Sequence, residues 1–288
     1  MKTNQKINKK YHNIQRDRHA HNFHGHFLLK EISKRINESL SDIKITFNNC
    51  IEIGIHNNIC LDYIISKNQN VNYFKSDLSL TVLNHNDLHK SNKICFDHDI
   101  WAFSKEAFDL IVSNYYLNLS NDLSTLFNRI NFSLKPNGFF LCAIPGTESL
   151  KELKDCMMIA DQELYNGVYQ RFNNYLNIEN ISNLLKDNNF KLSVIDNDFI
   201  ELRYKNFDEL INDIKHLGQS YLYLDKKKNF ENKIYFKKVE EIYWKKYSYK
   251  NQLFCKHQVI FLSGWKYDSN QQLPLMPGEA KSLMKDVL

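Results

Sequence analysis

Short apolar runs alternate with amphipathic stretches through the first half of the chain. Apolar residues recur at helical spacing over 27–40 and predict an amphipathic helix, while the run 50–53, which ends at Gly54, is short enough to be a buried strand. The same pattern predicts, in chain order, strand 71–76, helix 78–83, strands 93–96 and 108–113, helix 123–134 and strand 139–144. We expect Asn121 to cap helix 123–134 and the segment 135–138 to end it. This alternation implies βαβ units and therefore an α/β fold, a doubly wound, Rossmann-like, mostly parallel sheet with helices on both faces.

The pattern becomes less regular after Pro145. The expected elements are, in order, helix 149–164, an aromatic stretch over 165–175, a further helix, a strand near 191–195, a Lys-rich exposed loop or helix start over 225–233 and a last strand over 258–262. Neither an internal repeat nor a convincing linker divides the chain. We therefore expect a polar N-terminal arm over 1–26 and a single domain over 27–288, with an insertion at about 146–176.

The composition is that of a folded protein, since 43% of the residues are apolar and 13% are aromatic. The six cysteines form no C-x-x-C pair, so we expect reduced core thiols rather than a disulfide framework or a zinc site. A local histidine cluster lacks companions at ligand spacing, which favours a surface or N-terminal helix role and no metal; its members are His19, His21, His24 and His26.

Charge and hydropathy narrow the class of protein further. The net charge of +5 is a small excess that lies partly at the N-terminus, which favours a solvated arm over nucleic-acid binding. No apolar run approaches the roughly 20 residues of a membrane span. Because a signal-peptide core is also missing, the sequence predicts a cytoplasmic protein without a transmembrane segment.

Acidic residues stand at the ends of three successive predicted strands. In doubly wound sheets, ligands bind beyond the carboxyl ends of the strands. Glu52 precedes Gly54 at the end of the first strand, Asp77 ends the second strand about 25 positions after Glu52, and Asp97 ends the third. A carboxylate at the second position can accept hydrogen bonds from both ribose hydroxyls of an adenosine. The order of the three favours an adenosine site, although a strand-end aspartate taken alone is more often a turn former or a helix cap than a ligand group.

Several stretches resemble one branch of the class I methyltransferase superfamily. The chain is similar to the family that joins the malonyl-carrier-protein O-methyltransferases of biotin synthesis to the mitochondrial complex I assembly factor known as an arginine hydroxylase, and especially to α-proteobacterial relatives of that factor. The matching stretches are Arg16-Asp17-Arg18 with residues 27–31, Glu52-Ile53-Gly54, Asp97 with residues 108–113, residues 134–138, residues 146–150 with Glu152-Leu153, and Gly264-Trp265-Lys266-Tyr267. The tail over 271–281 is similar to the assembly-factor branch rather than to the biotin branch.

The resemblance implies a seven-stranded class I methyltransferase fold with a helical insertion after strand five. It also implies S-adenosyl-L-methionine as cofactor and an N-terminal helix that closes over the site. The cofactor-site residues carried over are Glu52, Gly54, Ile55, His56, Asp77, Leu78, Asp97, His98 and Asn114. Arg171 and Tyr115 are the candidate substrate contacts, and a local ion pair is the open alternative for Arg171. No catalytic residue is assigned.

Two functions remain open at this point. One is methyl transfer to a carboxylate on a small molecule, a carrier protein or another protein; the Lys-rich loop at Lys226, Lys227 and Lys228 would supply a basic rim. The alternative is a complex I assembly factor that acts by binding complex I subunits or by modifying an arginine. It is favoured by a degenerate cofactor loop, where Ile55 and His56 replace the usual small residues. A fold that serves structure alone is a third possibility, and the sequence leaves the oligomeric state open.

Overall fold

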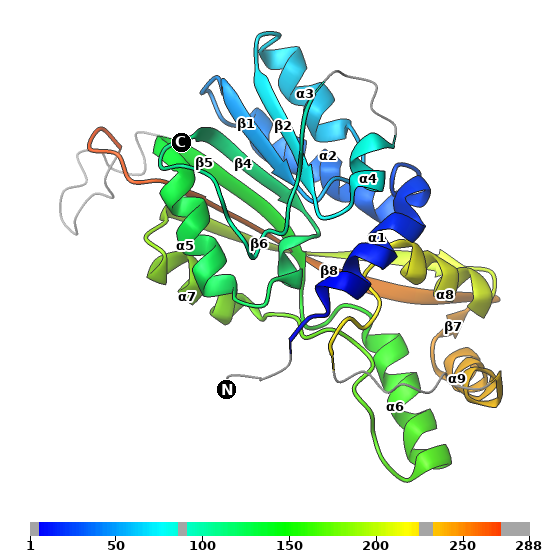
Figure 1. Cartoon of the computed structure of the whole chain (residues 1–288). Helices are drawn as coiled ribbons and strands as arrows, with labels where there is room; N and C mark the ends of the chain where they lie inside the picture. The colour runs from blue at the N-terminus through cyan, green and yellow to red at the C-terminus, as the bar shows by residue number, and fades with distance from the viewer. Residues whose placement is uncertain (1–5, 86–90, 225–232, 272–288) are drawn as a thin grey trace, which may run out of the picture.

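A mixed β-sheet forms the centre of the molecule (Figure 1). The computed structural model describes residues 6–85, 91–224 and 233–271. Its strands are β1 (Asn49–Ile53), β2 (Asn72–Asp77), β3 (Asn92–Cys95), β4 (Phe108–Asn114), β5 (Leu134–Pro145), β6 (Lys191–Tyr204), β7 (Ser248–Tyr249) and β8 (Gln252–Trp265). The strand order is β3-β2-β1-β4-β5-β8-β6, and the short β7 lies off this path and pairs with β8. β1 to β5 are parallel and β8 is antiparallel to both of its long neighbours, which confirms the predicted fold class.

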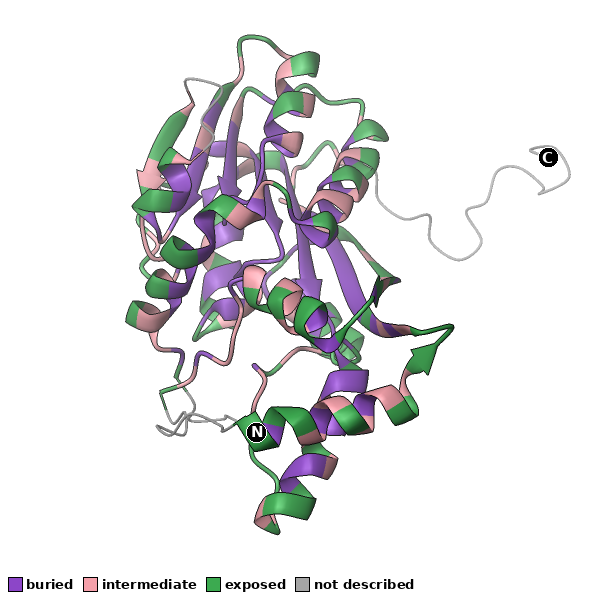
Figure 2. Ribbon diagram, turned by 90° about the vertical axis from the view of Figure 1, so that its right-hand side faces the viewer, coloured by how far each residue is buried: buried purple, intermediate pink, exposed green. Residues whose placement is uncertain are grey.

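Helices cover both faces of the sheet. They are α1 (Lys9–Phe23), α2 (Phe27–Ser41), α3 (Ile59–Lys67), α4 (Leu80–Asn84), the 3₁₀ turn η1 (Leu117–Leu119), α5 (Leu123–Ser133), α6 (Lys151–Tyr165), α7 (Ile178–Asp187), α8 (Phe207–His216) and α9 (Lys233–Lys246). The apolar residues of α2 and α3 pack on one face of the sheet, and those of α5 and α7 pack on the other. Successive side chains of a strand point to opposite faces of the sheet and so belong to different cores. In β4, Leu110 and Val112 face α2 while Ile111 faces α5. Figure 2 shows the buried residues concentrated in the strands.

A third apolar cluster lies beyond one end of the sheet. Residues of α6, α8 and α9 pack there with the ends of β6 and β8. The strands predicted near 191–195 and 258–262 are in fact parts of this long antiparallel pair, which carries the chain beyond the parallel sheet. Within the described ranges, no helix has both the length and the apolar character that crossing a membrane would require.

Two local expectations change. Asn121 does not cap α5; the Asp122 side chain accepts the hydrogen bond from the Thr125 amide at 3.0 Å, and Asn121 instead accepts one from the Ile7 amide. The segment expected as a polar arm contains α1, a helix that the apolar pattern did not predict. The domain boundaries stay a prediction, and the Lys226–228 rim and the tail from residue 272 lie outside the described residues.

Candidate functional site

The carboxyl ends of β1, β2 and β4 meet α1. Asp77 closes β2 with its carboxylate buried. The Ile55 amide donates to this carboxylate at 3.1 Å and the Ser79 amide donates at 2.9 Å, so the loop after β1 and the start of α4 are both tied to it. The structure therefore brings together Ile55 and Asp77, two residues that the resemblance assigned to the cofactor site.

Arg16 of α1 occupies this position. Its side chain is buried, and Nε donates to Asp77 at 3.3 Å while Nη2 forms an ion pair with the same carboxylate. Nη2 also donates to the Ile55 carbonyl at 2.7 Å, and Nη1 donates to His56 Nε2 at 2.9 Å. The guanidinium thus binds Asp77, which the strand-end pattern assigned to a ribose, and two residues that the resemblance assigned to the cofactor site, Ile55 and His56.

Aromatic rings enclose the Arg16 guanidinium. Its Cζ lies 4.3 Å from the Phe23 ring centroid and 5.0 Å from that of Tyr116, within the range of cation–π attraction. Tyr116 also explains why Gly54 is a glycine. Gly54 has φ +80°, and a Cβ atom added there would lie inside the Tyr116 ring's van der Waals envelope. The space against Gly54 is therefore filled by Tyr116.

His56 is a neutral hydrogen-bond acceptor in this arrangement. Burial, reinforced by the Arg16 guanidinium, holds the pKa of His56 well below its ordinary value. Since arginine only donates, His56 Nε2 accepts and its proton lies on Nδ1. Within the described part of the chain, His56 Nδ1 and both ring nitrogens of the buried His12 have no hydrogen-bond partner.

A second cation from α1 lies at the end of β3. Lys9 Nζ is 3.2 Å from Asp97, 2.9 Å from Asp99 and 3.2 Å from His98 Nε2. Burial, followed by the Lys9 charge, lowers the pKa of His98 to about 4, so its ring is neutral near pH 7. The ligand atoms of Asp97, His98 and Asp99 lie within 4.8 Å of one another, which is close enough for a metal ion, but the Lys9 ammonium bonds to all three side chains here.

Glu52 and Asn114 have structural partners. The Glu52 carboxyl accepts a hydrogen bond from Tyr73 at 2.6 Å, inside the core, and burial raises the pKa of Glu52 to about 7. The Asn114 amide donates to the Leu29 carbonyl at 3.1 Å and to Ser33 Oγ at 2.8 Å, which fastens α2 to the end of β4. Both residues hold the frame of the site, and Asn114 Oδ1 has no partner among the residues that the structure describes.

The remaining predicted residues lie around this centre. Tyr115 is buried and has φ 54°; its amide donates to the Ala143 carbonyl at 2.7 Å, and its carbonyl accepts from Gln219. Leu78 is half-buried directly after Asp77.

Arg171 lies apart from this centre, at a cavity beside α6. Its guanidinium pairs with buried Asp161, with Nε 3.1 Å from Oδ1 and 3.0 Å from Oδ2. It also stacks on the Tyr235 ring, with Cζ 4.2 Å from the centroid. The carboxylate that Arg171 contacts in this structure thus belongs to its own chain, in line with the local-pair alternative.

Sequence reasoning did not assign Arg16, Lys9 or Tyr116 to the candidate site. Lys9 belongs to the basic N-terminus, for which the sequence indicates a solvated arm, and the apolar pattern does not single out Tyr116. One signal was available, because Arg16 belongs to a stretch that matches the resembling family. Nothing in local periodicity marks Arg16 as buried or Lys9 as half-buried against Asp97 and Asp99, so their contacts become apparent only in the three-dimensional structure.

Comparisons with known proteins agree with this architecture. Residues 24–193 match a family described as "Methyltransferase domain". The chain is 29% identical over 285 residues to "Arginine-hydroxylase NDUFAF5, mitochondrial" of Dictyostelium discoideum, a match that covers 92% of this chain and 65% of that protein, less than two thirds of its length. It is 22% identical over 247 residues to a malonyl-[acyl-carrier protein] O-methyltransferase of Legionella pneumophila, covering 82% of this chain and 83% of that one.

A solved structure shows the same fold. The YcgJ protein of a Bacillus species superposes with a TM-score of 0.55 at 11% identity, covering 83% of this chain and 100% of that protein. At this identity the likeness extends to the fold and no further.

Proposed function

Because this chain belongs to the methyltransferase domain family, we propose that it binds S-adenosyl-L-methionine at the carboxyl ends of β1, β2 and β4 and transfers its methyl group to a carboxylate or a protein-linked acceptor. The observation that carries the proposal is the juxtaposition of Asp77 with the loop after Gly54, linked by the Ile55 amide at 3.1 Å. Such a carboxylate suits the ribose hydroxyls of a nucleoside. The sulfonium of the cofactor is already activated, so the protein's contribution would be alignment and exclusion of water.

The cofactor does not fit the site as it is arranged here. Asp77 already accepts hydrogen bonds from Arg16, Ile55 and Ser79, and the Tyr116 ring fills the space against Gly54. Binding therefore requires Arg16 to leave Asp77, together with a shift of Tyr116. Arg16 and the nucleoside would compete for one carboxylate.

The closed arrangement is itself incompletely satisfied. Both ring nitrogens of His12, Nδ1 of His56 and Nδ1 of His98 are buried without a partner in the described ranges. Each buried polar atom left unpaired costs about 1–3 kcal/mol. These costs make the observed arrangement less stable relative to one in which α1 has moved and a polar ligand has entered. The unpaired atoms therefore support a ligand-binding site here.

Calorimetric titration with S-adenosylhomocysteine tests the proposal. Wild type, Asp77→Ala and Arg16→Met are compared, with Arg18→Met, an exposed change on the same helix, as the matched control. We expect binding by wild type, loss of binding in Asp77→Ala, and tighter binding in Arg16→Met because the internal competitor is gone. No heat with any variant at about millimolar ligand, a concentration at which even weak specific binding is detected, would refute the cofactor site.

The occupied site favours a second candidate function, that of an assembly factor which acts by binding a protein partner. In this case the Arg16–Asp77 pair is a permanent structural element, and the domain offers a surface for a protein partner and catalyses no reaction. The similarity to the Dictyostelium protein over 92% of this chain supports the branch. Copurification with respiratory complex I subunits, by a wild-type protein that gives no heat with S-adenosylhomocysteine, would favour this candidate over methyl transfer.

A further inference from the structure

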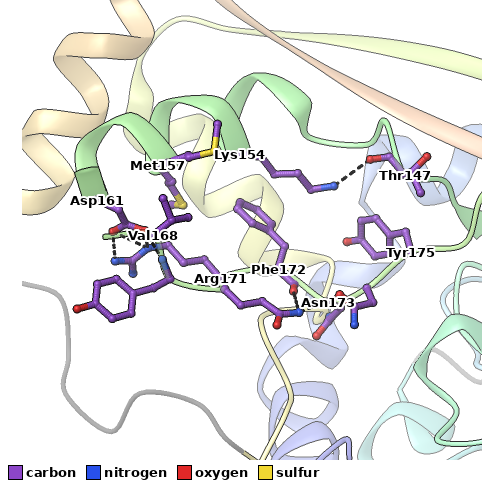
Figure 3. Close-up of a pocket in the computed structure, with 13 residues that line it drawn as sticks. Thr147, Lys154, Met157, Asp161, Val168, Arg171, Phe172, Asn173 and Tyr175 are labelled. Carbon is purple, nitrogen blue, oxygen red and sulfur yellow. Dashed lines mark hydrogen bonds and ion pairs between the residues drawn. The ribbon is translucent and has the colours of Figure 1, made fainter. Parts of the chain in front are cut away.

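A cavity of about 830 Å³ opens between α6 and the aromatic stretch that follows it (Figure 3). Its volume is within the range of pockets that hold drug-sized molecules. Apolar side chains from both segments line it, chiefly Met157, Met158, Val168 and Phe172. The lining therefore suits an apolar body.

The charges in the cavity do not cancel. At one end, Asp161 and Arg171 pair with each other. Figure 3 shows Lys154 directed toward the other end, where Nζ donates to the Thr147 carbonyl at 3.2 Å. In residues 6–85, 91–224 and 233–271, no carboxylate lies within the 4.0 Å of an ion pair with Lys154 Nζ.

Aromatic faces partly compensate Lys154. Its Nζ lies 4.8 Å from the Tyr175 ring centroid and 5.7 Å from that of Phe172. Burial nevertheless lowers the pKa of Lys154 to about 8, because the ammonium has lost water. The charge of Glu148, a carboxylate that pairs with Lys151, opposes this shift only in part, and among the described residues no carboxylate forms an ion pair with Lys154 Nζ. An anion placed beside Nζ would supply that missing counterion.

The cavity also reaches the end of the sheet that carries the candidate site. Thr147 lies two residues after the last residue of β5, and Gly146 between them forms a bridge with Leu176. Asn173 donates to the Gln219 carbonyl at 3.0 Å, and the Gln219 side chain donates to the Tyr115 carbonyl after β4. The Thr147 end of the cavity therefore lies next to the carboxyl end of β5, and hydrogen bonds through Asn173 and Gln219 connect its wall to the end of β4.

We propose that this cavity binds the methyl acceptor, and that the acceptor combines one anionic group, held by Lys154, with an apolar body that lies against Met157, Val168 and Phe172. The assignment as acceptor rests on the proposed function. The binding preference itself rests on the cavity alone, so the two can fail separately.

Calorimetry with sodium octanoate, octanol and octylamine as probes tests the preference. We expect octanoate to bind wild type, and octanol and octylamine to bind at least about tenfold more weakly, which corresponds to 1.4 kcal/mol. Lys154→Met keeps the length of the side chain without its charge and should abolish the difference between octanoate and octanol. Lys154→Arg should keep it.

Lys186→Met is the control, since Lys186 is exposed on α7 and is not among the residues that line the cavity. Its octanoate affinity should equal that of wild type. The proposal would be overturned if wild type bound octanoate and octanol equally or did not bind octanoate. It would also be overturned if a folded Lys154→Met variant kept the octanoate affinity of wild type. If the protein bound octanoate but not S-adenosylhomocysteine, the anion site would stand and its role as the methyl-acceptor site would be refuted.

Discussion

Replacement of Arg16 by methionine removes a buried charge from a pair that joins α1 to the sheet. Methionine keeps an unbranched apolar chain between the Phe23 and Tyr116 rings, so the change acts mainly on the charge. Asp77 keeps its hydrogen bonds from the Ile55 and Ser79 amides but loses its counterion. The Ile55 carbonyl and His56 Nε2 lose their donor as well.

The magnitude follows from these contacts. Removing one member of a buried ion pair costs about 3–5 kcal/mol, because an uncompensated charge is left behind. The two amides that remain on Asp77 place the expected loss near the lower end, at about 3 kcal/mol. At about 2–4 °C per kcal/mol for a large domain, the melting temperature should fall by about 6–12 °C.

Urea unfolding followed by circular dichroism measures the loss. Arg18→Met is the control, because Arg18 is exposed on the same helix, and it should change the free energy of unfolding by less than about 0.5 kcal/mol. In Arg16→Met/Asp77→Asn the unpaired charge is gone, so most of the loss should be recovered and the two substitutions should couple by at least about 1 kcal/mol. If Arg16→Met cost no more than Arg18→Met, or if the coupling were zero, the buried pair would be refuted.

Three further predictions concern buried groups. Gly54→Ala should lower the free energy of unfolding by more than about 2 kcal/mol, because φ +80° disfavours alanine and the Tyr116 ring must move. Gly25→Ala is the control and should change the free energy of unfolding little, because a Cβ there meets nothing closer than 3.8 Å. Equal urea midpoints for the two variants would contradict the close packing of Tyr116 on Gly54. Burial raises the pKa of Glu52 in the folded protein from 4.5 to about 7, so the folded state opposes ionisation of this carboxyl group. Glu52→Gln should therefore be more stable than wild type by an amount that grows from pH 5 to pH 8 and reaches about 3 kcal/mol. A difference in unfolding free energy that did not grow with pH would contradict this. Burial lowers the pKa of His257 in the folded protein to about 3, so as pH falls below about 6.5 the unfolded chain binds a proton that the folded protein does not, and wild type becomes less stable. Between pH 6.5 and pH 5 the free energy of unfolding of His257→Leu should therefore fall by about 2 kcal/mol less than that of wild type. Parallel plots of unfolding free energy against pH for the two proteins would contradict this.

The α/β pattern could be predicted because it is local. Strand and helix periodicity over 27–144 depends on which side chains face the two apolar cores, and each such segment recurs in the structure within a few residues. The positions of Asp77 and Asp97 at strand ends follow from the same pattern. The long β6–β8 pair was predicted only in part, because β6 is largely exposed and shows little apolar alternation.

The sequence by itself determined the doubly wound fold and the strand-end carboxylates, since both follow from short-range spacing. Only the tertiary structure decided what those carboxylates bind. Arg16 and Asp77 are 61 positions apart, and α1 has no continuous apolar stripe that would mark its inner face. The burial of Arg16 depends on its ion pair with Asp77 and on the ring of Tyr116, and both partners lie far from α1 along the chain. Long-range pairing of this kind leaves no periodic trace in the sequence.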